Sequence, residues 1–143
     1  AKILVPVDLS EASGSAVRRS AELAQLFGAA LILCHVVPDE LYPEGMGFNT
    51  PTAKDHAKSL EQRLEEIATK EVPAEVPREA HVWTGTPSAT ILHGAKEHGV
   101  DLIVMPTHGR KGVSHLFLGS TTEKVIRGAA CEVLVLRYQP TAS

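Results

Sequence analysis

Residues 101–122 carry the side chains of this sequence that are best suited to bind an anion. They read Asp-Leu-Ile-Val-Met-Pro-Thr-His-Gly-Arg-Lys-Gly-Val-Ser-His-Leu-Phe-Leu-Gly-Ser-Thr-Thr. An apolar run typical of a buried strand comes first, a basic loop with glycines follows, and a helical pattern begins at about residue 119. Glycines let a ligand come close to the backbone, and a helix N-terminus offers unpaired N–H groups and partial positive charge. The segment therefore predicts a phosphate site; the alternative is an ordinary connection in which Ser120 is the N-cap.

The loop also carries charged and titratable side chains. Arg110 and Lys111 are either neighbours of a phosphate or ordinary solvated charges, and the sequence leaves both interpretations open. His108 and His115 bracket the loop, where a hydrogen-bonded histidine is commoner than a metal ligand. Elsewhere His81 stands by itself on a predicted strand, and the remaining histidines lack metal-ligand spacing. We therefore expect no metal site.

Several familiar motifs are absent from the chain. It has no Walker-type loop, no Gly-x-Gly-x-x-Gly after a strand and no Gly-x-Ser-x-Gly elbow. The sequence also offers no residue that can be named as a general base. We expect any hydrolysis of ATP to be slow or absent.

Five apolar segments alternate with helical patterns and must position these residues. The predicted strands cover residues 2–7, 30–37, 79–83, 102–105 and 132–137, with a helix between each pair. Because most of the strands are apolar on both faces, we expect a parallel sheet covered by helices on both sides. The predicted fold is a single α/β domain over residues 1–143, Rossmann-like, with a doubly wound five-stranded parallel sheet in the order 3-2-1-4-5.

The predicted topology also places the ligand site. In doubly wound sheets, ligands bind at the carboxyl ends of the strands where the strand order reverses. This point lies between the first strand, which ends at Asp8, and the fourth, which ends at Pro106. Residues 38–52 have no periodicity and are expected to be a lid, a partner surface or a disordered loop.

Two helical faces are predicted from spacing. Phe27 is expected to close the buried face of the first helix, directly before the stop signal at Gly28. Val125, Ile126 and Ala129 are expected to form the buried face of the last helix.

Composition narrows the class of protein. The 143 residues carry a net charge of −3 and 4% aromatic residues, which argues against a nucleic-acid partner. No apolar stretch approaches the roughly 18 residues that a membrane span requires, so no membrane partner is expected. Cys34 and Cys131 have the surroundings of small buried hydrophobes, which favours a reducing, cytoplasmic location.

Over essentially its whole length the chain resembles the universal stress protein family. The resemblance is carried by Ile-Leu-Val-Pro-Val-Asp at residues 3–8, Leu-Cys-His-Val at 33–36, Gly-Thr-Pro at 85–87, Asp-Leu-Ile-Val-Met at 101–105, Thr-His-Gly at 107–109 and Gly-Ser-Thr-Thr-Glu-Lys-Val at 119–125. Members that bind ATP carry Gly, two residues, Gly, nine residues, Gly, then Ser or Thr. Gly109, Gly119 and Ser120 match this pattern, and Pro106 replaces its first glycine. Proline has no N–H and a fixed φ, so weaker nucleotide binding is expected.

The resemblance implies a set of nucleotide-binding residues. Adenine and ribose contacts fall on Pro6, Val7, Asp8, Val36, Met105 and Pro106. Phosphate contacts fall on Gly109, Gly119, Ser120, Thr121 and Thr122, and the implied cofactor is ATP, with Mg²⁺ as a possible companion. Asp8 is expected either to accept from the exocyclic amine or a ribose hydroxyl, or to cap the first helix. Gly119 is expected to leave space for a phosphate or to adopt a dihedral that other residues exclude.

The function that the resemblance implies is that of a cytoplasmic stress-response protein. It would bind ATP or a related adenine nucleotide and act by signalling or partner binding, as a homodimer paired through strand 132–137. Two alternatives stay open. One is a dimeric interaction module without nucleotide, and the other is a slow ATP hydrolase in which His108 or Asp8 acts on a phosphate.

Overall fold

The structure, a computed structural model, describes residues 1–39, 51–106 and 119–137. Strands and helices alternate along these residues as β1 (Lys2–Pro6), α1 (Glu11–Phe27), β2 (Ala30–Val37), α2 (Pro51–Glu71), β3 (Arg78–Thr84), α3 (Pro87–Glu97), β4 (Leu102–Pro106), α4 (Ser120–Gly128) and β5 (Glu132–Leu136). Most of the predicted 38–52 loop and the glycine loop with Gly109 lie outside the described residues.

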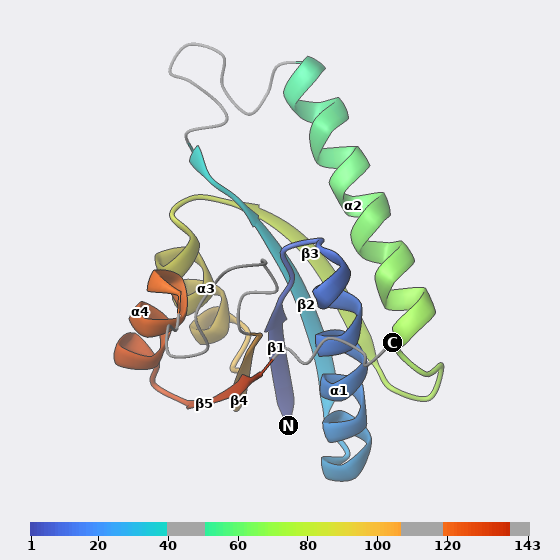
Figure 1. Cartoon of the computed structure of the whole chain (residues 1–143), viewed down its shortest axis with the longest axis vertical. Coiled ribbons are helices and arrows are strands. Elements are labelled where there is room, and N and C mark those ends of the chain that lie inside the picture. The colour runs from blue at the N-terminus through green and yellow to red at the C-terminus, as the bar shows by residue number, and fades with distance from the viewer. Residues whose placement is uncertain (40–50, 107–118, 138–143) are drawn as a thin grey trace.

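The five strands form one parallel sheet in the order β3-β2-β1-β4-β5 (Figure 1). Leu4 at the centre of β1 pairs with Ile32 of β2 on one side and with Ile103 of β4 on the other. The predicted fold class and strand order are therefore confirmed. The strand with alternating polarity, β3, lies at one edge of the sheet as its pattern indicated, and β5 lies at the other.

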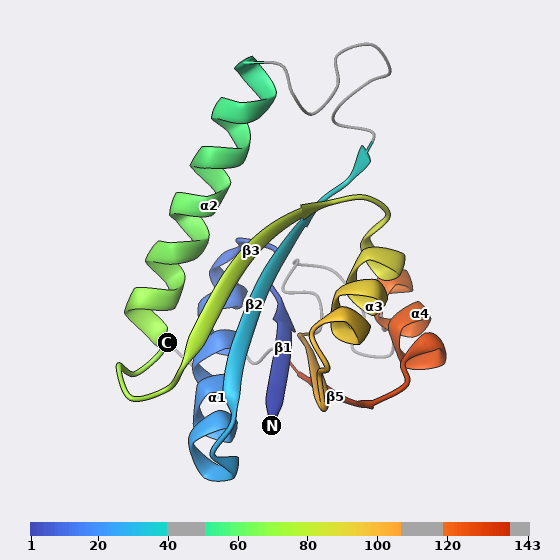
Figure 2. The same ribbon diagram turned by 180° about the vertical axis from the view of Figure 1, so that it is seen from behind.

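Helices cover the sheet on both faces. Figures 1 and 2 show α1 and α2 on one side of the strands and α3 and α4 on the other. Successive side chains of a strand point to opposite faces, so Val5 packs with α1 and α2 while Leu4 packs with α3 and α4. None of the helices in the described ranges is both long and apolar enough to span a bilayer.

Two predicted core positions are wrong. Ile126 is 42% exposed, because each residue advances a helix by about 100° and the buried line of α4 runs through Thr122 and Val125 instead. Phe27 is 62% exposed, because it is the last residue of α1 and the chain reverses directly afterwards at Gly28, in a left-handed conformation with φ 64°. The last turn of α1 extends past the lower end of the sheet in Figure 1.

The two cysteines are free thiols in different surroundings. Cys34 is fully buried, as predicted, and burial raises the pKa of its thiol far above the ordinary value. Cys131 is half-buried rather than buried, and desolvation also raises its pKa. A raised pKa keeps both side chains in the unreactive thiol form, which is the opposite of what a nucleophilic cysteine requires.

The contact between α3 and β3 depends on Gly94. A Cβ atom at this position would lie 2.4 Å from a ring carbon of Trp83, far closer than real Cβ atoms approach. The indole cannot readily move, because His81 and His98 pack against it with ring centroids at 5.7 and 5.9 Å. Glycine at this position therefore lets the helix lie against the edge strand.

We predict that Gly94→Ala lowers the free energy of unfolding by about 1–2 kcal/mol, because overpacking outweighs the gain in helix propensity. Gly14→Ala in α1 is the matched control. Its Cβ would meet Glu71 Oε1 at 3.5 Å, an ordinary contact, so stability should hold or rise by up to about 1 kcal/mol. Urea denaturation measures both, and equal effects of the two substitutions would contradict the role given to Gly94.

Candidate functional site

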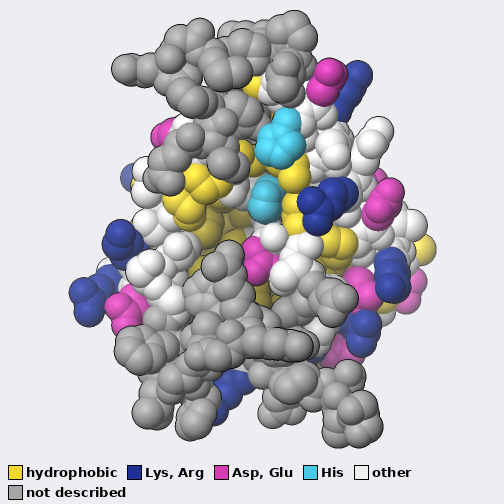
Figure 3. Space-filling view, turned by 45° about the horizontal axis from the view of Figure 1, so that its top comes forward, with side chains coloured by type: hydrophobic (Ala, Val, Ile, Leu, Met, Phe, Trp, Pro, Cys, Tyr) yellow, Lys and Arg dark blue, Asp and Glu magenta, His cyan; other side chains and the backbone are white. Residues whose placement is uncertain are grey.

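A cavity of about 330 Å³ opens at the carboxyl ends of the strands, where the strand order reverses. This volume lies within the range of small-molecule pockets, roughly 300–1,000 Å³. Figure 3 looks onto this end of the molecule and shows hydrophobic side chains gathered with histidine and acidic side chains beside them. The lining residues are Pro6, Val7, Asp8, Ser10, Ser13, His35, Val36, Pro38, Pro87, Ile91, Met105, Pro106, Thr121 and Thr122.

Other hollows of similar or larger volume are present. One of about 400 Å³ lies between α3 and α4, and one of about 540 Å³ lies beside α2 and β3. Neither is at the point where the strand order reverses, where parallel sheets of this kind hold their ligands. The cavity at the strand ends is therefore the stronger candidate.

The cavity brings together eight of the eleven residues that the resemblance implied. They come from four elements that are far apart in the chain: Pro6, Val7 and Asp8 at the end of β1, Val36 in β2, Met105 and Pro106 in β4, and Thr121 and Thr122 in α4. Gly119 and Ser120 directly precede the two threonines but do not line the cavity, and Gly109 lies outside the described residues.

Backbone pairing positions the floor of the cavity. The Val7 N–H donates to the Cys34 carbonyl at 2.7 Å and so extends the pairing of β1 with β2 beyond Pro6. The Val7 and Met105 side chains are each only 4% exposed, although both reach the cavity. The two strands on either side of the reversal therefore supply a rigid apolar surface, suited to the flat face of a heterocyclic base.

Asp8 is fixed at the rim of the cavity by local hydrogen bonds. Its Oδ1 accepts from the Ser10 N–H at 2.9 Å, the Ser10 hydroxyl at 2.6 Å and the Ser13 hydroxyl at 2.5 Å. Between these residues Leu9 has φ 65°, a left-handed conformation that a non-glycine residue rarely adopts. The carboxylate therefore organises the entry to α1, while Ser10 makes no side-chain capping bond of its own.

His35 is a lining residue that the site prediction omitted. Its Nδ1 lies 2.7 Å from the Val7 carbonyl, and since a carbonyl oxygen only accepts, Nδ1 carries the proton. Nε2 of the neutral ring is then an acceptor. The sequence showed His35 inside an apolar strand, and only the pairing of β2 with β1 reveals that its ring reaches the cavity.

The N-terminus of α4 adjoins the cavity. Gly119 is the N-cap and Ser120 the first helical residue, so the interpretation of Ser120 as the N-cap is wrong by one position. Gly119 has φ −62° and ψ 155°, which other residues adopt as readily, so its dihedral does not require glycine. The first N–H groups of the helix have no partner within it and are available to an anion. Among the described lining residues none is Lys or Arg, so these dipoles are the positive end of the described cavity.

Comparisons with known proteins find matches to both the sequence and the fold of this chain. A profile described as the universal stress protein family matches residues 1–137. The chain is 37% identical to a universal stress protein of Thermus aquaticus over 94% of this chain and 97% of the relative. It is 32% identical to the universal stress protein YxiE of Bacillus subtilis over 95% and 98% of the two chains. The solved structure of MJ0577 superposes with a TM-score of 0.82 at 26% identity, over 98% of this chain and 97% of that one.

Two more distant structures have the same fold and hold ligands. One is a universal stress protein in complex with cAMP, at 20% identity and a TM-score of 0.69 over 96% and 97% of the two chains. The other, from Archaeoglobus fulgidus, is in complex with dAMP, at 24% identity and a TM-score of 0.66 over 94% and 95%. At these identities the likeness shows a shared fold.

We predict that Asp8→Ala lowers the free energy of unfolding by about 1–2 kcal/mol, because it leaves the buried Ser13 hydroxyl without its acceptor. Ser13→Ala should cost clearly less, because it removes the hydroxyl together with its hydrogen bond. In a double-mutant cycle, Asp8→Ala should therefore cost less in the Ser13→Ala background than in the wild type. Additive effects would show that the two side chains are not coupled.

Proposed function

The chain belongs to the universal stress protein family, and we propose that it binds ATP or a related adenine nucleotide in the cavity at the strand ends. The observation that carries the proposal is the convergence of eight predicted residues from four elements on one cavity. The relatives in complex with cAMP and dAMP support an adenine ligand. In this proposal the protein is cytoplasmic and acts in the stress response by signalling or partner binding.

The base lies against the apolar floor formed by Val7 and Met105, beside Val36. Polar groups at the rim supply the directional contacts that a largely apolar pocket needs for specificity. Asp8 accepts hydrogen bonds from the exocyclic amine or a ribose hydroxyl, and Nε2 of His35 offers a second acceptor. The network that fixes Asp8 orients its carboxylate before the ligand arrives, which lowers the entropic cost of binding.

The phosphates lie at the N-terminus of α4. Thr121 and Thr122 of its first turn line the cavity, and the first N–H groups of a helix have no partner within it. Pro106 offers no N–H at the position where ATP-binding relatives have glycine, and its half-buried ring occupies part of the lining. The polyphosphate is therefore held by fewer backbone donors. Mg²⁺ would bind through phosphate oxygens and water, as it usually does in nucleotide sites.

Binding rather than hydrolysis is the proposed activity. Oδ1 of Asp8 already accepts three hydrogen bonds, which suits a carboxylate that orients a ligand better than one that abstracts a proton. The alternative is slow hydrolysis of ATP in which His108 acts on a phosphate, and His108 lies outside the described residues.

A second copy of this chain is the proposed partner of β5. This strand is at the edge of the sheet, so its outer N–H and C=O groups lack a neighbouring strand in the described structure. Leu134 of β5 and Leu26 of α1 are 38% and 77% exposed and line the same surface hollow of about 400 Å³. Strand pairing across a two-fold axis would cover this apolar edge.

We predict that ATP binds the wild type and that Thr121→Glu abolishes ATP binding, because the new carboxylate would stand where the phosphates lie. The fold should survive, since an acidic residue in the first turn favours a helix. Thr121→Val is the matched control, and it should lose only the contribution of one hydroxyl. Calorimetric titration measures the affinity of each protein for ATP and, in parallel, for adenosine, which lacks the phosphates and reports only on the base and ribose part of the site. Adenosine affinity should differ little among the three proteins.

Two outcomes would contradict the proposed site. If the Thr121→Glu variant bound ATP as tightly as the wild type does, the phosphates would not lie at the N-terminus of α4. If the folded wild type bound none of ATP, AMP and cAMP, the alternative function, a dimeric interaction module without nucleotide, would be favoured.

We predict that light scattering gives the mass of a dimer and that Leu134→Lys shifts the equilibrium to monomer, because each β5 would then place a charge in the apolar contact. Ile126→Lys is the matched control, since Ile126 is 42% exposed on α4 and does not line the hollow between α1 and β5. This variant should remain dimeric. A monomeric wild type over a wide concentration range would contradict pairing through β5.

A further inference from the structure

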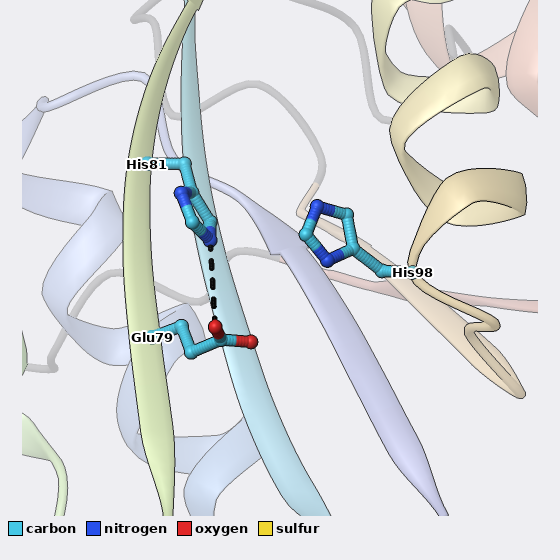
Figure 4. Close-up of side chains that lie close together, drawn as sticks. All are labelled: Glu79, His81 and His98. Carbon is cyan, nitrogen blue, oxygen red and sulfur yellow. Dashed lines mark ion pairs between the residues drawn. The ribbon is translucent and has the colours of Figure 1, made fainter.

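Two histidines and a glutamate that are distant in the sequence meet beside the edge strand. Glu79 and His81 are two residues apart on β3 and share the face toward α3, and His98 follows the last residue of that helix. One ligand atom from each of the three side chains lies within 4.8 Å of the others. Figure 4 shows the ring of His98 extending from the end of α3 toward His81, while the ring of His81 extends along β3 toward Glu79.

One nitrogen of this cluster lacks a hydrogen-bond partner in the described part of the chain. Nε2 of His81 is buried and makes no hydrogen bond to the described residues, although the side chain as a whole is 33% exposed. The nearest carboxylate oxygen, Oε1 of Glu79, is 4.0 Å away, beyond hydrogen-bond distance. A buried polar atom without a partner costs free energy, and a bound cation would satisfy this nitrogen.

The neighbouring rings hold the imidazole of His81 in place. Trp83 lies parallel to His81, with 13° between the ring planes, and the His81 and His98 centroids are 5.3 Å apart. Trp83 in turn is backed by Gly94. Packing therefore limits the rotation of His81, while Glu79, which is exposed, is free to adjust its rotamer toward an ion.

We infer that Glu79, His81 and His98 form a binding site for a borderline divalent cation of the zinc type. Two imidazoles and a carboxylate are a donor set that zinc accepts, with water in the fourth tetrahedral position. With metal–ligand bonds of about 2.0–2.2 Å, neighbouring ligand atoms of a tetrahedral ion lie about 3.4 Å apart. The donor atoms are now up to 4.8 Å apart, and rotamer adjustments of Glu79 and His98 would bring them to this separation.

The site is separate from the cavity at the strand ends. Pro87 and Ile91 at the start of α3 line that cavity, and His98 follows the end of the same helix. His98 is eleven positions after Pro87, which corresponds to about 16 Å along the helix axis. A cation here would join the edge strand β3 to the end of α3 without touching a nucleotide.

Trp83, the single tryptophan of the chain, supplies the readout. Ni²⁺, which imidazole ligands also bind, should quench its fluorescence saturably, and Zn²⁺ should reverse the quenching by competition. Zn²⁺ alone should raise the melting temperature of the metal-free protein, since binding to the folded state stabilises it. The protein used is the full chain without nucleotide.

Glu79→Gln and His98→Gln test the ligands with little change of volume, and the melting curve without metal checks that each folds. Each should weaken Zn²⁺ affinity by at least the roughly tenfold to hundredfold that loss of an outer-shell partner costs. His93→Gln is the matched control, because His93 is an exposed histidine on the same helix, paired with Glu97 at 3.4 Å. It should bind Zn²⁺ like the wild type. Unchanged affinity in Glu79→Gln and His98→Gln, or absence of saturable binding to the wild type, would overturn the site.

Discussion

The central constraint of this molecule is the position of β1. It is paired with β2 on one side and with β4 on the other. After β1 the chain adds β2 and β3 on one side of the sheet and then crosses over to add β4 and β5 on the other side. Helices that return on opposite faces cannot both cover the carboxyl end of β1, so a cavity remains there. Pro6, Asp8 and Pro106 stand at this cavity because the strands end at it. The candidate nucleotide site is therefore a consequence of strand order, and its residues add specificity to a place that the fold already provides.

Helix α3 extends from this cavity to the cluster of Glu79, His81 and His98. Its first turn contributes Pro87 to the cavity, its middle packs Gly94 under Trp83, and its end places His98 beside His81. The close contact at Gly94 fixes the helix against β3 and so sets the geometry at both ends. A rigid α3 suits both proposals, which place a nucleotide at one end of the helix and a cation at the other.

The sequence predicted the fold because most of the strands are apolar on both faces, a pattern typical of a parallel sheet covered by helices on both sides. Strand order then placed the cavity between Asp8 and Pro106, while the family resemblance supplied eight of the residues that line it, and the function of these residues in nucleotide binding stays a prediction. Periodicity failed where neighbouring apolar residues compete for one face, as Ile126 and Val125 do in a short helix. It also could not show that His81 and His98 meet, because the contact joins a strand to the end of the following helix.

The most direct test of the account is to map adenine nucleotide onto the backbone by nuclear magnetic resonance. Titration of isotope-labelled protein with ATP should shift the amide signals of Val7, Val36, Thr121 and Thr122, which line the cavity. The amide of Ile67, on the outer helix α2, should not move. A folded protein whose cavity amides stay unchanged at saturating ATP, or whose largest shifts lie on α2, would contradict the claim that the strand-order reversal builds a nucleotide site.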